Sequence, residues 1–168
     1  MSLYLGLDVG TTTLSVAVVD IDQRALAYTR TTEHHADVTT PTDKARGRAE
    51  VDVGRLRAGC ADLVRGALGE LGRRRARLRA VGVTGQQHGM VLLDGGNRPL
   101  GPGITWQDRR VLDAGDDGET FLSRFIRLAG GVGAFERMGC LPSRGYLGPT
   151  LSWLQAHDKV PADATSVC

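Results

Sequence analysis

The chain has 168 residues and a mass of 17.9 kDa, with 41% hydrophobic residues, 24% charged residues and a formal net charge of +2. This length and composition are typical of one globular domain, and they exclude a fibre, a disulfide-stapled mini-protein and a natively disordered tail. The small positive charge favours no particular class of partner.

The first part of the chain predicts an antiparallel meander. Apolar and small or polar residues alternate over 3–9, as in a strand with one buried face. The segment 14–19 is rich in β-branched residues and predicts a second strand, and 25–32 predicts a third after a short turn. The polar stretch 33–48 is expected to be a loop.

An amphipathic helix is predicted after Asp52, which suits the N-cap position. Its apolar face recurs at helical spacing and comprises Leu56, Cys60, Leu63, Val64, Ala67, Leu68 and Leu71. Apolar strands are expected over 80–84 and 90–94. Further helices are expected to begin near Asp108, Glu119 and Pro149. The order predicts an α/β fold whose sheet starts with the meander and whose later strands are joined through helices.

The segment after the first strand is a candidate phosphate site. Asp8 at a strand end can hold Mg²⁺, and a tight turn at Gly10 can present backbone N–H groups. Thr11, Thr12 and Thr13 add hydroxyl donors. An ordinary hairpin turn with an exposed Asp is the alternative, and the sequence contains no Walker A motif.

Three further segments hold candidate ligand-binding residues. Gln87 and His88 lie between glycines after an apolar strand and can pair with the hydroxyl groups of a polar ligand. Trp106 can form the apolar wall of a sugar pocket, with Asp108 beside it. Tyr146 follows a glycine and is a candidate surface contact. A solvated loop, a helix N-cap and a buried core are the alternative interpretations of these segments.

Other features argue against further partners. The arginines of 73–79 follow the predicted helix, where cations favour the helix dipole, and no nucleic-acid motif accompanies them. The apolar runs are shorter than the roughly 20 residues that a membrane-spanning helix needs. Cys60, Cys140 and Cys168 form no CxxC pair and are interpreted as reduced thiols of a cytoplasmic protein.

Taken together and in this order, the motifs resemble the N-terminal part of the FGGY carbohydrate kinases. The segment 5–12 resembles the first phosphate motif of that family, and 85–89 resembles the Gly-Gln-Met-His-Gly signature of xylulokinases. The segment 106–110 is similar to Trp-Asn-Asp-Gly-Arg of xylulokinases and closer to the Trp-Gln-Asp form of glycerol kinases and sedoheptulokinases. The spacing from Tyr146 to Trp153 matches a Phe-to-Trp stretch of xylulokinases.

The resemblance implies a ribonuclease-H-like (actin-like ATPase) domain and an ATP-dependent kinase acting on a xylulose-like or sedoheptulose-like ketose. By position, Asp8 would hold Mg²⁺, and the turn from Gly10 to Thr13 would approach the phosphates of ATP. The residues bordering the sugar would be Gln87, His88, Trp106, Asp108 and Tyr146. Gln87, Arg109 and Thr150 stand where xylulokinases have Met, Gly and often Lys, which leaves the identity of the sugar open.

The resemblance also implies that residues 1–168 are a partial N-terminal kinase domain. The catalytic Asp of the family and its nucleotide-binding domain would lie beyond Cys168, so we expect the chain alone to be inactive. A surface left open by the missing part would favour self-association. A non-catalytic sugar-binding or interaction module and a ribonuclease-H-type nuclease are the alternative functions.

Overall fold

The computed structural model describes residues 2–168, which fall into two compact units. Unit 1 contains the residues up to Ala36 together with Val53–Gln86, and unit 2 contains Asp37–Asp52 and Gln87–Cys168. Among residues 2–168, no helix is both long and apolar enough to cross a membrane.

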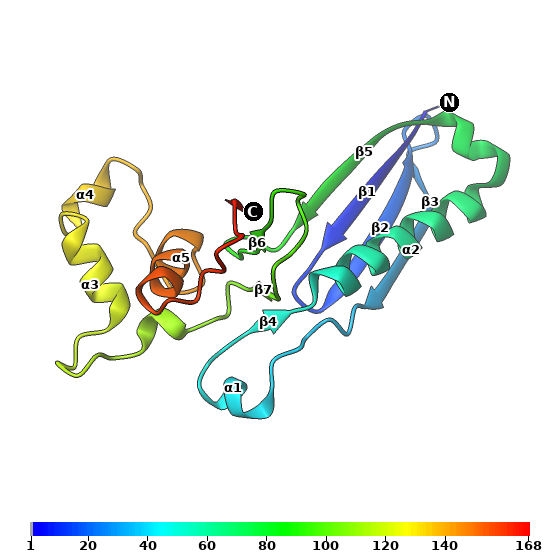
Figure 1. Cartoon of the computed structure of the whole chain (residues 1–168). Coiled ribbons are helices and arrows are strands. Elements are labelled where there is room, and N and C mark those ends of the chain that lie inside the picture. The colour runs from blue at the N-terminus through cyan, green and yellow to red at the C-terminus, as the bar shows by residue number, and fades with distance from the viewer. Residues whose placement is uncertain (1) are drawn as a thin grey trace. The chain divides into compact units, whose positions relative to one another are not determined.

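Unit 1 is built on a four-stranded mixed sheet with the order β3-β2-β1-β5 (Figure 1). Strand β1 (Leu3–Val9) pairs antiparallel with β2 (Thr13–Asp20), which pairs antiparallel with β3 (Ala25–Glu33). Strand β5 (Leu78–Gly85) lies parallel to β1. The predicted meander and mixed α/β sheet are confirmed.

Helix α2 (Val53–Leu71) covers one face of this sheet, as Figure 1 shows. Its buried side chains pack against alternate residues of β1 and β2, because successive strand residues point to opposite faces. The core consists of Leu3, Leu5, Leu7, Leu14, Val16, Val18, Leu63, Ala67 and Leu71. The helix begins directly after Asp52 as predicted, and the arginine-rich segment continues as a 3₁₀-helix, η1 (Gly72–Arg77).

The opposite face of the sheet carries small residues in register. Gly6 pairs with Ala17 on one side and with Gly82 on the other, and Ala17 pairs with Thr29. A Cβ added at either glycine would meet open space, and a hollow of about 430 Å³ lies over this row.

Unit 2 has two short antiparallel strand pairs and several helices. Strand β4 (Glu50–Val51) pairs with β7 (Gly103–Ile104), and β6 (Leu92–Leu93) pairs with β8 (Ser166–Val167). The helices are α1 (Pro41–Ala45), η2 (Arg110–Leu112), α3 (Phe121–Leu128), α4 (Gly133–Glu136) and α5 (Leu147–Ala156). The core contains Met90, Ile104, Val111, Trp153 and Leu154.

Several local expectations need correction. The segment 33–48 contains α1, because the Thr40 side chain accepts a hydrogen bond from the Asp43 N–H and Pro41 suits the first turn. The strand expected over 90–94 is limited to β6, since Met90 forms an isolated bridge. Near Asp108 only the short η2 forms, and α5 starts at Leu147, two residues before Pro149.

Candidate functional site

The predicted phosphate residues lie in unit 1, where β1 ends and turns into β2. The backbone N–H of Gly10 donates to the Thr13 carbonyl at 2.9 Å, which closes a tight turn. A Cβ at Gly10 would lie 2.9 Å from that carbonyl oxygen, so the turn requires glycine. Asp8 and Thr12 are exposed, whereas Thr11 is half-buried.

His34 supports this turn through hydrogen bonds, a role that no sequence pattern predicted. Its Nε2 lies 2.8 Å from the Thr11 carbonyl oxygen and its Nδ1 accepts from the Ala36 N–H at 2.9 Å. A carbonyl only accepts, so the proton lies on Nε2 of a neutral ring. The backbone N–H of His34 also donates to Thr12. The imidazole lies one residue beyond the end of β3 and therefore holds the turn in place from there.

The carboxyl ends of two parallel strands meet beside Asp8. Asp8 pairs in register with Thr84, and the backbone N–H of Gln86 donates to the Val9 carbonyl at 2.9 Å. The side-chain Oε1 of Gln86 is buried and has no hydrogen-bond partner among residues 2–168. Ligands of open α/β sheets bind where strands end in this way. This end of unit 1 therefore offers an exposed carboxylate and a buried amide acceptor.

These oxygen ligands fit a Mg²⁺-nucleotide better than a metal ion that is bound by protein side chains alone. Mg²⁺ is usually bound by one or two carboxylates together with phosphates and water. Among residues 2–168 no group of three His, Cys, Asp or Glu side chains could hold a metal ion. Asp8 can supply the single carboxylate that such an ion needs from the protein.

The predicted sugar residues all lie in unit 2, and His88 and Tyr146 are in contact there. Their rings stack with centroids 3.9 Å apart and planes 7° apart. His88 has a positive φ of 67°, which is uncommon for a residue with a side chain and indicates a constrained backbone. His88 and Gln87 are exposed, and Tyr146 is half-buried.

Close backbone packing brings the other segments to this stack. Met90 and Ile104 exchange two backbone hydrogen bonds of 2.8 Å, which aligns the segment after His88 with the segment before Trp106. Gly145 has a φ of 70°, and a Cβ there would overlap the backbone of Trp106. Trp106, 39% exposed, therefore lies beside the segment that carries Tyr146.

Cys140 also lies beside Tyr146, which the sequence did not indicate. Its Sγ lies 4.0 Å from the phenolic oxygen. The neighbouring Cys140, chiefly through its hydrogen bond, raises the pKa of Tyr146 above its ordinary value. The phenol can therefore donate a hydrogen bond to a ligand, as an unperturbed tyrosine does at physiological pH.

Asp108 is 1% exposed, and its carboxylate accepts hydrogen bonds from other groups of the chain. One oxygen accepts from the backbone N–H and Nε of Arg110, and the other accepts from Arg110 Nη2 and the Ala49 N–H. Arg110 Nη2 also donates to Glu50 at 2.7 Å. Burial alone would lower the pKa of Arg110, but Asp108 and Glu50 raise it, so the guanidinium stays charged. This network fixes the loop after Trp106.

Comparisons with known proteins identify the family of this chain. The model of the FGGY family of carbohydrate kinases, N-terminal domain, matches residues 3–165. A xylulose kinase of Streptomyces rubiginosus is 33% identical over 100 residues, which cover 59% of this chain and 19% of that protein. A glycerol kinase of Aromatoleum aromaticum is 31% identical over 161 residues, which cover 94% of this chain and 29% of that protein.

The fold is shared with solved sugar kinases. The crystal structure of xylulose kinase from Rhodospirillum rubrum matches with a TM-score of 0.81 and 22% identity, covering 99% of this chain and 32% of that chain. This chain thus spans about a third or less of each of these proteins. It belongs to the FGGY family of carbohydrate kinases, and the match is to the N-terminal domain of that family.

Proposed function

We propose that this chain is the sugar-binding part of an ATP-dependent kinase whose acceptor is a ketose resembling xylulose or sedoheptulose. The observation that carries the proposal is the His88–Tyr146 stack next to Trp106 in unit 2. The similarity to proteins named xylulose kinase supports a ketose, and the similarity to a glycerol kinase supports a polyhydroxy acceptor more generally.

The stack can recognise a sugar through both shape and hydrogen bonding. Aromatic rings give a rigid apolar surface, and the imidazole of His88 and the phenol of Tyr146 add polar groups at their edges. The exposed amide of Gln87 can both donate to and accept from hydroxyl groups. A few polar groups on an apolar wall are the usual composition of a small-molecule site.

In this proposal Asp108 acts as a positioning residue. Both of its oxygens are already used, so it offers no open oxygen to a sugar. Its hydrogen bonds instead hold the loop that carries Trp106. Loss of Asp108 would therefore change sugar binding through the position of Trp106.

In unit 1, Asp8 and the turn from Gly10 to Thr13 are proposed to face the phosphates of ATP. The charge of Asp8 would hold Mg²⁺, and the Thr12 hydroxyl would donate to a phosphate oxygen. Bound Mg²⁺ supplies neutralisation of the charge that develops during phosphoryl transfer. His34 and Gly10 keep the turn in its shape before the nucleotide arrives.

The His88–Tyr146 stack and the neighbouring Trp106 include no carboxylate that could take a proton from the sugar. Phosphoryl transfer also needs a group that orients and deprotonates the attacking hydroxyl. We therefore infer that the general base comes from outside the His88–Tyr146 stack. We also infer that the chain alone binds the sugar without transferring phosphate.

The test combines a binding and a turnover measurement. Xylulose and sedoheptulose are titrated against the chain by calorimetry, and ADP release is followed with Mg-ATP and the same sugars. Binding of a ketose without ADP above background supports the proposal. Sugar-dependent ADP release lost on Asp8→Ala would show that the chain is a complete kinase, and the absence of ketose binding would refute sugar recognition by this chain.

A further inference from the structure

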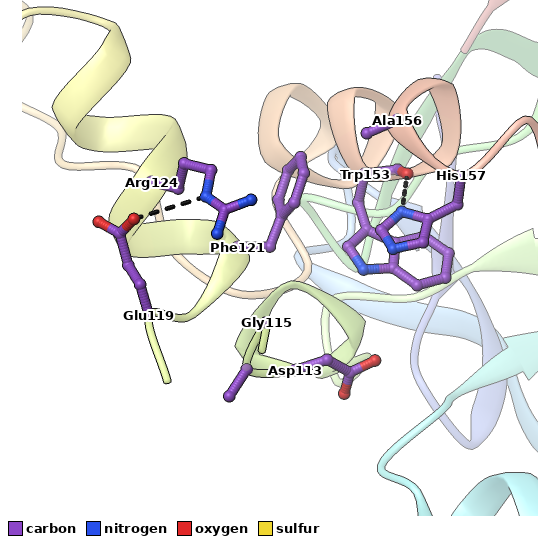
Figure 2. A pocket seen from close by; sticks show the side chains of 9 residues that line it. Asp113, Gly115, Glu119, Phe121, Arg124, Trp153, Ala156 and His157 are labelled. Carbon is purple, nitrogen blue, oxygen red and sulfur yellow. Dashed lines mark hydrogen bonds and ion pairs between the residues drawn. The ribbon is translucent and has the colours of Figure 1, made fainter. Parts of the chain in front are cut away.

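A second pocket of about 210 Å³ lies in unit 2, between the loop before α3 and the end of α5 (Figure 2). It is lined by side chains and backbone of Asp113, Gly115, Glu119, Phe121, Trp153 and His157. None of the residues that the sequence assigns to the sugar lines it.

The pocket contains a buried donor without a partner. Trp153 is 6% exposed, and its Nε1 has no hydrogen-bond partner among residues 2–168. Figure 2 shows this nitrogen on the side of the indole ring toward Gly115 and Phe121. A buried N–H is costly when left unpaired, so a ligand oxygen that accepts from it would bind favourably.

Both faces of the indole ring are already in use. The imidazole of His157 stacks on Trp153 with centroids 4.0 Å apart and planes 20° apart. The guanidinium carbons of Arg48 and Arg110 lie 5.5 and 5.4 Å from the ring centroid. The ring therefore offers the pocket its N–H edge, which carries a partial positive charge, and does not offer a π face to an organic cation.

The charges of the lining disfavour an anion. Asp113 pairs with Arg48, and Glu119 pairs with Arg124 and Arg127. Among the side chains that line the pocket, these two carboxylates face one guanidinium, that of Arg124. Each of these guanidiniums is already paired with a carboxylate, so none of them is left to pair with an added negative charge.

An acceptor lies beside the unpaired donor. His157 Nδ1 lies 2.7 Å from the Trp153 carbonyl oxygen, so it carries the proton and leaves Nε2 as an acceptor. The carboxylates of Asp113 and Glu119 already accept from Arg48, Arg124 and Arg127. A hydroxyl group matches the remaining donor and acceptor, because it accepts from Trp153 and donates to His157. The ring of Phe121 offers an apolar surface to a carbon skeleton.

We propose that this pocket binds a small neutral polyhydroxy compound, a polyol or a monosaccharide, as a second site separate from the His88–Tyr146 stack. The N–H of Trp153 donates to one ligand hydroxyl, and Nε2 of His157 accepts from a hydroxyl of the ligand. The proposal goes beyond the kinase function and does not depend on it.

The test follows the indole N–H signals of the ¹⁵N-labelled chain by nuclear magnetic resonance. The chain has two tryptophans, so Trp106→Phe assigns the Trp153 signal. Glycerol, xylitol and sorbitol are titrated, with inorganic phosphate and tetramethylammonium as charged probes. We expect a saturable shift of the Trp153 signal with a polyol and none with either charged probe. Saturation by phosphate or tetramethylammonium alone, or no shift with any polyol, would overturn the proposal.

A pair of variants separates binding from folding. Ala156→Leu fills the pocket from the exposed end of α5, and Ala58→Leu is the same change at an exposed position of α2. Ala156→Leu should weaken polyol binding by about tenfold or more, which is what loss of a hydrogen bond and its contacts produces. Ala58→Leu should bind as the unchanged chain does. Equal affinity in both variants would overturn the assignment to this pocket.

Discussion

Replacement of Asp108 by Ala should destabilise unit 2 strongly. Asp108 receives four hydrogen bonds of 2.8 to 2.9 Å, three from Arg110 and one from the Ala49 N–H. Arg110 is 5% exposed, so the substitution leaves a buried guanidinium with Glu50 as its remaining carboxylate partner. Breaking a buried ion pair from one side costs about 3–5 kcal/mol. This is a large fraction of the roughly 5–15 kcal/mol that stabilises a typical domain.

Urea unfolding followed by tryptophan fluorescence measures the effect, because Trp106 and Trp153 both belong to unit 2. With a urea dependence of about 1–3 kcal/mol per molar, the midpoint should fall by at least about 1 M. Asp116→Ala, at an exposed carboxylate of the loop before α3, should change the free energy of unfolding by less than about 0.5 kcal/mol.

A double variant shows whether the unpaired guanidinium causes the loss. Asp108→Leu combined with Arg110→Met removes both charges and should recover part of the lost stability, because an apolar pair pays no ionic desolvation penalty. If Asp108→Ala unfolds at the same urea concentration as Asp116→Ala, the buried network does not stabilise unit 2 and this reasoning is refuted.

Three further predictions follow from other contacts. Gly145→Ala should destabilise unit 2 by at least about 1–2 kcal/mol, because φ is 70° there and the added Cβ overlaps Trp106; a urea midpoint equal to that of the unchanged chain would contradict this. The hydrogen bond from Lys44, and then that from the Thr39 N–H, keep the pKa of the exposed Asp37 below its ordinary 3.8 against a partial desolvation. The stabilisation from this carboxylate is therefore complete above the unfolded pKa and is lost as pH falls through the lower folded pKa. Asp37→Asn should flatten this acid dependence in urea unfolding, and an unchanged dependence would disprove it. The open sheet face of unit 1, where Leu26 is 65% exposed, predicts self-association of the chain. Size-exclusion chromatography should therefore show a mass above 17.9 kDa, and this mass should fall in Leu26→Lys. Elution at 17.9 kDa at every concentration would contradict the prediction.

Local patterns in the sequence predicted the elements of unit 1 well. The alternation over β1 and the helical spacing over α2 each reflect one buried face, and burial of such faces drives the packing of the sheet against the helix. The meander followed from short turns between the first strands. In unit 2 the boundaries were less predictable, because strands of two residues such as β4 and β6 leave no periodic pattern.

The roles of several site residues depend on partners far along the chain. Asp108 looks like an N-cap in sequence, but its partner Ala49 lies 59 residues away and turns it into the anchor of a buried network. His34 lies in a polar stretch, and only its contact with Thr11 shows that it supports the turn. The pocket at Trp153 requires the loop before α3 to fold against α5. Sequence patterns report the burial of a face but not such pairings.

The measurement that tests the central claim most directly is ketose binding by Tyr146→Ala beside Tyr4→Ala. Both variants remove a tyrosine ring, but Tyr146 stacks on His88 and Tyr4 is 38% exposed on the sheet of unit 1. Stacked aromatic pairs contribute enough for a loss of roughly tenfold in affinity for xylulose or sedoheptulose in Tyr146→Ala, with Tyr4→Ala unchanged. Equal ketose affinity in the two variants, with both folded, would contradict sugar recognition at the His88–Tyr146 stack.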